Sequence, residues 1–214
     1  SREPYAREVG TVGFPLPGVE VKIDPDNNEV LCRGHNVMMG YYKDDELTAQ
    51  VIDADGWFHT GDLGRFTDKG QLVLVGRLKN IFKTSYGKYV NPQLIEEKFS
   101  ESPFIEKIVV VGENQKYAAA LISPDFAFLE CWCKRHDIIF TTAQEVLKNP
   151  KVIQRYAKEV NKYNEFFGET EKIKKFELVP EEWSIMNEIL TPTLKVRRKL
   201  VQQRYSDVIE RMFA

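Results

Sequence analysis

The stretch Phe58-His59-Thr60-Gly61-Asp62-Leu63-Gly64 determines how the rest of this 214-residue chain is interpreted. It contains an apolar approach that indicates a strand, a Thr-Gly-Asp turn and the start of a second strand near Arg65. Turns select Gly and Asp for local conformational reasons, so a Thr-Gly-Asp alone is a weak signal. Its meaning depends on the stretches that follow it.

Two later stretches accompany the Thr-Gly-Asp in a fixed order. GRLKNIFK occupies residues 76–83, and LTPTLK occupies residues 190–195. Together the three resemble three late motifs of the adenylate-forming superfamily, which comprises acyl-CoA synthetases, peptide-synthetase adenylation domains and luciferases. Three matches in the right order are far more specific than any one of them. The family's phosphate loop and adenine-side motif are not found in this sequence.

Composition indicates a folded chain without a strong global charge. Hydrophobic residues make up 43% and aromatic residues 12%, and 30 Lys and Arg against 32 Asp and Glu give a net charge of -2. This balance provides no general attraction to nucleic acid or anionic lipid. Three cysteines argue against a disulfide framework and favour a cytoplasmic location. Cys131 and Cys133 indicate helix packing, with a metal or redox pair as the alternative; we expect no metal site.

The first third of the chain predicts short strands separated by turns. Residues 19–23 alternate apolar and polar side chains, and residues 29–34 follow after an Asp-Pro-Asp-Asn-Asn turn. Residues 43–52 are the one helical candidate here, and residues 66–75 predict a hairpin. The family resemblance implies that residues 1–75 are the end of a large AMP-binding N-terminal domain, in a β-rich subdomain.

The remaining residues, 76–214, predict a small α+β domain with a sheet of about three strands. The family resemblance implies that this domain is mobile. The expected elements are a helix capped by Asn91, strands at 107–111 and 117–122, a helix at 126–136, a Thr142/Glu145 capping box, a helix opened by Asn149-Pro150 and ended by Gly168, and a strand at 173–179. The apolar face predicted for the helix after Asn149 comprises Val152, Ile153, Tyr156, Val160 and Tyr163.

Thr60, Asp62 and Arg77 are the predicted nucleotide-binding residues. A carboxylate accepts two hydrogen bonds, which suits the paired hydroxyls of a ribose, although a turn aspartate that caps its own backbone is the alternative for Asp62. The resemblance implies that Arg77 helps to hold the nucleotide, and a surface ion pair is its alternative. His59 and His35 stay outside the predicted chemistry, because no Ser or Asp pattern indicates a triad.

The resemblance implies a hinge at Gly76 and Arg77, followed by a mobile hairpin. Many family members carry Asp where this chain has Gly76, and glycine suits a residue that absorbs a large backbone rotation. Lys83, Gly87 and Lys88 belong to a hairpin whose amino-acid sequence resembles that of long-chain acyl-CoA synthetases. There the missing side chain of glycine lets the backbone lie close to the pantetheine arm of CoA.

Lys195 is the predicted catalytic residue. It falls on the lysine of the last family motif, and Leu194 replaces the glycine that usually precedes it. The resemblance implies that this lysine reaches the oxygens shared by the fatty carboxylate and the α-phosphate, where charge builds up. A solvated, basic helix start and a nucleic-acid patch are the alternatives. Asp207 and Glu210 in the expected helix weaken the second, and Arg197, Arg198 and Lys199 are not assigned to CoA phosphates.

The predicted function is that of the C-terminal part of a long-chain fatty acid–CoA ligase. Its substrates would be fatty acid, ATP with Mg²⁺, and CoA, and the chain alone would be inactive. The alternatives are adenylation of an aryl or short-chain acid, a non-catalytic binding module of the same fold, and a nucleic-acid binder, which we do not favour. We also expect peripheral membrane contact and self-association of the chain through exposed apolar surface.

Overall fold

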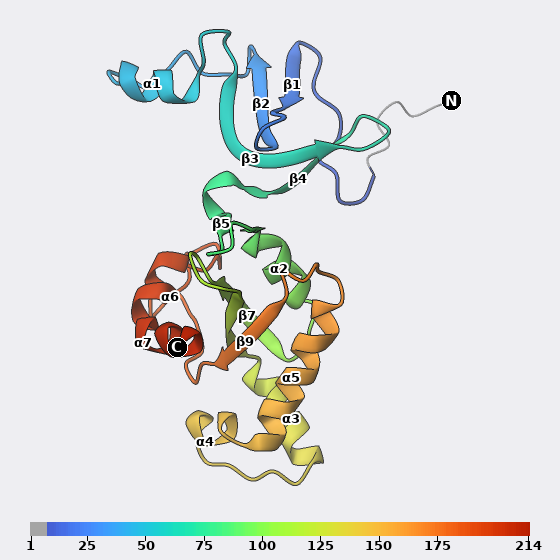
Figure 1. The fold of residues 1–214 in the computed structure, drawn as a ribbon, viewed down its shortest axis with the longest axis vertical. Helices are drawn as coiled ribbons and strands as arrows, with labels where there is room; N and C mark the ends of the chain where they lie inside the picture. Colours follow the sequence, from blue (N-terminus) through green and yellow to red (C-terminus); the bar gives the residue numbers. More distant parts are fainter. Residues whose placement is uncertain (1–7) are drawn as a thin grey trace. The chain divides into compact units, whose positions relative to one another are not determined.

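The computed structural model describes residues 8–214, and the chain divides into two compact units, Ser1–Ile81 and Phe82–Ala214 (Figure 1). Residues 1–7, which belong to the predicted domain of residues 1–75, lie outside the described part. Each unit builds a sheet of its own and adds helices to it. The predicted α+β fold is confirmed.

The first unit is built on a four-stranded antiparallel sheet in which chain order is spatial order. Asn28, at a φ of 62°, closes the turn between the first two strands, in a left-handed conformation that Asn tolerates better than most residues. The strands are β1 (Val19–Ile23), β2 (Glu29–Gly34), β3 (Phe58–Phe66) and β4 (Leu72–Arg77). The predicted strands of the first third are therefore confirmed.

One helix and one short helical turn complete this unit. Helix α1 (Asp45–Val51) lies within the predicted range, and the Asp44 side chain caps it by accepting the Leu47 N–H. The 3₁₀ turn η1 (Leu78–Asn80) follows β4. Neither has a buried residue, so the sheet supplies the core of this unit.

The second unit is built on three strands, β7 (Ile105–Val111), β8 (Ala118–Pro124) and β9 (Ile173–Leu178). β8 is central, antiparallel to β7 and parallel to β9, as the predicted three-stranded sheet requires. Every residue of β8 is buried, and such a strand needs cover on both faces. β9 is left at the edge of the sheet.

Helices cover the two faces of this sheet unequally (Figure 1). Alternate strand residues face opposite sides, so Ile108 and Val110 pack in one cluster while Val109 and Val111 pack in the other. The first cluster is covered by α2 and α5, on the right of Figure 1, together with α3 and α4, and the second by α6 and α7. The helices are α2 (Pro92–Phe99), α3 (Phe126–Arg135), α4 (Ala143–Leu147), α5 (Pro150–Asn164), α6 (Arg198–Arg204) and α7 (Ser206–Phe213).

Several details of the helices differ from the sequence-based expectation. The prediction that Ile153 belongs to the apolar face of α5 is wrong, because its side chain is 44% exposed. Gly168 does not end α5, whose last residue is Asn164. The last helix is interrupted at Tyr205, so Asp207 lies in α7 and not in the helix that follows Lys195. No helix among residues 8–214 is both long and apolar enough to cross a membrane.

The caps that start the helices are mostly as predicted. The side chains of Asn91 and Asn149 accept N–H bonds at the starts of α2 and α5. Thr142 caps α4, but the Glu145 carboxylate bonds the N–H of Thr141, one residue before the N-cap. In a regular capping box the Glu145 carboxylate would accept the N–H of Thr142 itself, so this second bond of the box is displaced by one residue. Cys131 is exposed and Cys133 is buried on α3, so the two side chains face different directions.

Gly112, directly after β7, provides a test of the packing of the second unit. Its φ is 145°, and an added Cβ would lie 2.6 Å from the Tyr117 carbonyl oxygen. Gly112→Ala should therefore lower the free energy of unfolding by about 1–3 kcal/mol, through backbone strain and overlap. Urea denaturation followed by Trp132 and Trp183 fluorescence measures it.

Gly168→Ala is the matched control for this substitution. Its added Cβ would meet only the Glu171 carboxylate, at 3.8 Å, and Gly168 has no positive φ. Its effect should stay within about 0.5 kcal/mol. Equal unfolding free energies for the two variants would contradict the interpretation of Gly112.

Candidate functional site

Thr60, Gly61 and Asp62 lie inside the long strand β3 and not in a turn between two strands. His59 pairs with Leu31 and Leu63 pairs with Glu29, so three residues of β3 stand opposite Val30 alone. The motif is therefore a bulge in a continuous strand, and the predicted turn is wrong. A bulge re-aims the side chains it contains. Gly61 supplies the positive φ, 69°, that the bulge contains.

A buried carboxylate fastens this bulge. Glu29 is 4% exposed, and its two oxygens accept the Gly61 N–H at 2.8 Å and the Nδ1–H of His59 at 2.9 Å. The Thr60 hydroxyl donates to the Val30 carbonyl at 2.7 Å and accepts the Asp62 N–H at 3.0 Å. The Thr60 hydroxyl therefore already donates its hydrogen bond to the backbone, and the nucleotide-binding role of Thr60 stays a prediction.

Glu29 is the positioning residue that the sequence analysis missed. Its one signal in the sequence is an acidic residue directly before the apolar residues Val30 and Leu31. A buried carboxylate normally has hydrogen-bond partners, because an unpaired one is costly. The partners stand 30 and 32 positions away in the sequence, which no local pattern reveals.

Asp62 and Arg77 are cross-strand neighbours in the β3–β4 ladder. The Arg77 Nε forms an ion pair with Asp62 Oδ1 at 2.8 Å, and the side chains of Arg77 and Asp62 are 52% and 26% exposed. Within residues 8–214 no other partner bonds Asp62 Oδ2 or the two Nη groups of Arg77. The pair therefore offers one acceptor oxygen beside two donor nitrogens, which can bind hydroxyls and a phosphate together.

Gly76 and Arg77 are the last two residues of β4. Gly76 pairs with Leu63, at a φ of 152° that residues with a side chain rarely adopt. Both predicted hinge residues thus sit in a strand ladder that ends just before η1. Their hinge role remains a prediction.

The predicted hairpin is formed by β5 (Phe82–Lys83) and β6 (Tyr89–Val90). The buried Thr84 closes it by donating its N–H to the Lys88 carbonyl at 2.9 Å and accepting the Lys88 N–H on its hydroxyl at 3.2 Å. Gly87 adopts a φ of 76°, which requires glycine or a strained residue. Lys83, Gly87 and Lys88 thereby share one exposed tip.

The hairpin is attached to the turn between β7 and β8. The Asn114 N–H donates to the Lys83 carbonyl at 2.8 Å, and the Ser85 N–H donates to the Gln115 carbonyl at 2.9 Å. Phe82 packs its ring beside Gly112 at the end of β7. The position of the hairpin within its unit therefore depends on the end of one core strand.

Lys195 lies in a closed loop before α6, and its side chain is exposed without an ion pair among residues 8–214. A bridge between Leu190 and Val196 closes the loop, and Thr191 bonds the backbone of Lys195 twice, at 2.8 and 3.1 Å. Leu194 has a φ of 59°. α6 begins three residues later, at Arg198, so Lys195 lies just before the helix, and both its catalytic role and the alternative of a solvated basic stretch stay predictions.

Arg198, the first residue of α6, connects the end of the lysine loop to α2 and β7. Its Nη2 bonds both carboxylate oxygens of Glu96 on α2 at 2.6 Å, and its Nη1 bonds the Val110 carbonyl on β7 at 2.8 Å. Glu96 also accepts the Val110 N–H at 2.7 Å. One ion pair thus ties α2, β7 and the start of α6 together. The guanidinium of Arg198 is therefore engaged within the second unit.

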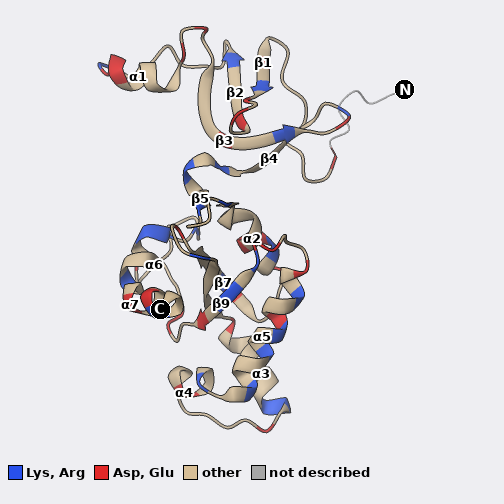
Figure 2. Cartoon of the chain, in the orientation of Figure 1, with Lys and Arg blue, Asp and Glu red and all other residues tan. Residues whose placement is uncertain are grey.

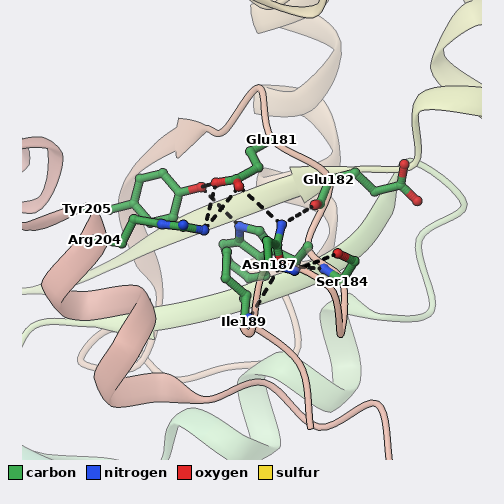
Figure 3. Close-up of polar contacts among 8 residues, drawn as sticks. Glu181, Glu182, Ser184, Asn187, Ile189, Arg204 and Tyr205 are labelled. Carbon is green, nitrogen blue, oxygen red and sulfur yellow. Dashed lines mark hydrogen bonds and ion pairs between the residues drawn. The ribbon is translucent and has the colours of Figure 1, made fainter. Parts of the chain in front are cut away.

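A second polar cluster holds the segment that leads to the lysine loop (Figure 3). The Glu181 carboxylate accepts bonds from Arg204 at 3.0 Å, the Tyr205 hydroxyl at 2.9 Å and the Asn187 amide at 3.1 Å. Asn187 in turn accepts the backbone N–H groups of Ser184 and Ile189. An irregular segment is thereby fixed to the end of α6 by side chains rather than by secondary structure.

A family model, that of the AMP-binding enzyme C-terminal domain, matches residues 79–214. The chain belongs to this family. The match covers the hairpin and the Lys195 loop in one continuous segment of the adenylate-forming fold. Within residues 8–214, no group of three or more His, Cys, Asp or Glu side chains is arranged to hold a metal ion.

Similar curated proteins extend the match to the first unit. The chain is 34% identical over 207 residues to a long-chain-fatty-acid–CoA ligase of Mycobacterium tuberculosis, covering 96% of this chain and 34% of that protein. It is 31% identical to long chain acyl-CoA synthetase 2 of Arabidopsis thaliana, covering 96% of this chain and 33% of that protein. The chain therefore spans about a third of the length of these relatives.

Solved structures share the fold. The adenylation and carrier didomain of a carboxylic acid reductase from Segniliparus rugosus, solved with AMP, aligns with a TM-score of 0.74 at 24% identity, over 94% of this chain and 28% of that one. An amide bond synthetase from Marinactinospora thermotolerans aligns at 0.62 and 24% identity, over 92% of this chain and 36% of that one. At this identity the likeness shows the fold alone.

Leu194 provides a test of the loop that presents Lys195. Left-handed backbone costs a residue with a Cβ about 1–2 kcal/mol, and more for a β-branched one. Leu194→Val should therefore lower the free energy of unfolding by about 1–2 kcal/mol, measured by urea denaturation. Leu194→Gly should change it by less than about 1 kcal/mol, because relief of strain offsets the greater entropy of unfolded glycine. A Val variant as stable as the Gly variant would contradict the strained loop.

Tyr205 provides a pH-dependent test of the Glu181 cluster. Burial raises the pKa of Tyr205 to about 12, and its bond to Glu181 acts in the same direction. The folded state therefore keeps a proton that the unfolded state loses near pH 10, so Tyr205 makes stability fall as pH rises from about 10 to 12. Glu181→Gln should lower the pKa of Tyr205, measured by NMR of ring-labelled tyrosine. An unchanged titration in this variant would refute the bond.

Proposed function

We propose that this chain forms the C-terminal third of an ATP-dependent, AMP-forming long-chain fatty acid–CoA ligase. The observation that carries the proposal is the Asp62–Arg77 pair, which offers an acceptor and two donors at the position of the nucleotide motif. The names of relatives at 31–34% identity support the long-chain acid as substrate. No residue of the chain has been assigned to the acyl chain itself.

In the first step, a carboxylate oxygen of the fatty acid attacks the α-phosphorus of ATP, and pyrophosphate leaves. The product is an acyl-adenylate, and Mg²⁺ enters this reaction with the triphosphate. Asp62 Oδ2 would accept hydrogen bonds from the ribose hydroxyls, and the Arg77 Nη groups would donate to the nucleotide. Both side chains would position the nucleotide without exchanging protons with it.

Lys195 would supply the cation for this step. Negative charge grows on the oxygens shared by the acid and the α-phosphate, and a fixed ammonium there stabilises the transition state. The exposed Lys195 side chain has no ion pair to break among the described residues. Its backbone is held by Thr191 and the Leu190–Val196 bridge, so the loop that carries the ammonium is fixed before substrate arrives.

In the second step, the CoA thiolate attacks the acyl carbonyl, and AMP leaves with the bonding electrons. The hairpin tip at Gly87 would lie against the pantetheine arm, because a residue without a side chain permits close approach. Exchange of the lysine loop for the hairpin would need rotation of the second unit about Gly76 and Arg77. A two-step reaction with one mobile domain would explain why the lysine loop and the hairpin occur in the same unit.

The first unit exposes apolar side chains that support a role as part of a larger protein. Val9, Leu16 and Met39 are 105%, 71% and 103% exposed, and Tyr42 is 87% exposed. Surface of this kind is typical of an interface. We propose that it meets the rest of the ligase and that the chain alone is inactive. A cytoplasmic location, peripheral membrane contact and self-association of the isolated chain remain part of this proposal.

Lys195→Ala tests the proposal in the full-length protein. Long-chain-fatty-acid-dependent exchange of pyrophosphate into ATP should fall by about 10²–10³, the usual effect of losing one transition-state donor. Thioester formation from preformed acyl-adenylate and CoA should survive, because that step does not need Lys195. Both rates are measured on the same preparation.

Lys199→Ala is the matched control, since Lys199 is an exposed lysine on α6, four residues beyond Lys195. It should keep wild-type exchange. Normal exchange in the Lys195 variant would refute its catalytic role, and the absence of exchange in wild type with every acid offered would refute the ligase.

A further inference from the structure

A groove of about 630 Å³ runs along β9 in the second unit, on elements that the proposed reaction does not use. Its walls come from the α4–α5 junction on one side and from α7 on the other. In Figure 1, β9 lies in front of the sheet, with α7 beside it and α4 below. The groove therefore follows the edge strand of the three-stranded sheet.

The backbone of this edge strand can still accept a neighbour. The Val179 N–H points toward β8, where it bonds the Ile122 carbonyl at 2.9 Å. One extra residue stands in β9 between Ile173 and Lys175, where the register with β8 shifts. After this shift the backbone groups alternate in direction, so Phe176 and Leu178 direct their N–H and C=O groups to the outer edge. Such an edge is a template for another extended chain.

The start of β9 already shows how the edge is satisfied. The Asn164 side chain donates to the Ile173 carbonyl and accepts the Ile173 N–H, both at 2.9 Å. One amide side chain thus imitates one residue of a neighbouring strand. Beyond Ile173 no side chain among residues 8–214 repeats this at Phe176 or Leu178.

The two sides of the groove differ in chemistry. On the α4–α5 side, apolar side chains lie beside Gln144 and Lys148: Phe176 and Leu178 pack against the core cluster that contains Leu147, and Ile153 is 44% exposed. On the α7 side stand Arg211 and Lys175, whose Nζ lies 5.8 Å from the Tyr117 ring centroid. An extended segment laid along β9 would present alternate side chains to these two sides.

The charge of the groove selects its occupant. Lys148, Lys174, Lys175 and Arg211 line it, against the single acid Glu177. Lys174 forms an ion pair at 2.9 Å with the exposed Glu169. Exposed ion pairs of this kind contribute little to stability, so Lys174 can exchange Glu169 for another acidic partner. Figure 2 shows the basic residues on β9. A second copy of this basic strand would be repelled, whereas an acidic segment would be attracted.

We propose that the β9 groove binds an extended acidic peptide segment of a partner protein, which adds a fourth strand to the sheet. Acidic side chains of the segment face Arg211 and Lys175, and its apolar side chains face Ile153 and Leu147. Main-chain bonds to Phe176 and Leu178 fix the register. This site is independent of the proposed ligase reaction, because none of its residues belongs to the nucleotide pair, the hairpin or the lysine loop.

The probe is a synthetic heptapeptide of alternating Glu and Val, titrated against the 214-residue chain by isotope-edited NMR. We expect saturable binding, and on binding the amide hydrogens of Phe176 and Leu178 should exchange with solvent at least tenfold more slowly. The Glu177 amide, which alternation directs toward β8, should not change. Lys175→Glu combined with Arg211→Glu should weaken binding at least tenfold, and Lys162→Glu on α5, outside the groove, should not.

Two further peptides separate strand addition from charge attraction. The same peptide with alternate backbone amides methylated should bind at least tenfold more weakly, because methylation removes the donors that a strand needs. The alternating Lys and Val peptide should not bind. Absence of binding up to 1 mM, equal binding of the methylated peptide, or protection confined to amides outside β9 would each overturn the proposal.

Discussion

The guanidinium of Arg198 holds three elements together by bonding Glu96 on α2 and the Val110 carbonyl on β7 at once. A fork of this kind fixes direction as well as distance, because both carboxylate oxygens are engaged. The hairpin is bonded to the turn after β7, and Lys195 stands three residues before Arg198. The hairpin and the Lys195 loop therefore take their positions from the same end of one core strand.

The first unit uses the same device with a different side chain. Glu29 is buried at the start of β2, and its carboxylate holds the bulge that contains Asp62. In each unit, the carboxylate that positions the predicted site is largely shielded from water, at 4% exposure for Glu29 and 19% for the Glu96 side chain. The predicted site residues Arg77 and Lys195 are exposed. This division is physically sensible, because exposed ion pairs are weak while removal of one partner of a buried pair is costly.

The sequence was sufficient for what depends on neighbours along the chain. Alternation located β1, the turn that follows it located β2, and Asn with Pro located the starts of α2 and α5. Its failures were of two physical kinds. A bulge in β3 was taken for a turn, because the pairing that keeps the strand continuous is with β2. Ile153 was placed in the core, because helical spacing does not reveal that a neighbouring groove leaves it exposed.

Arg198 and Glu96 show why the site itself was only partly predictable. The two are 102 positions apart, and each by itself resembles an ordinary surface charge on an amphipathic helix. The sequence of its motif identifies Lys195, whereas Arg198, which anchors the loop, belongs to no motif. Leu194 adds a related lesson: its positive φ gives a local reason for the glycine that usually stands there.

The Asp62–Arg77 pair links the nucleotide site to the proposed hinge. Arg77 is both the partner of Asp62 and the residue next to Gly76, so rotation of the backbone there moves the guanidinium. The pair uses Asp62 Oδ1 and the Arg77 Nε, so Asp62 Oδ2 and the Arg77 Nη groups would stay available to a nucleotide while the pair is intact. A nucleotide bound to both side chains would therefore favour the backbone conformation in which they are paired. A proposed hinge inside a strand ladder becomes intelligible on this basis, because the ladder and the ligand would hold the same conformation of Arg77.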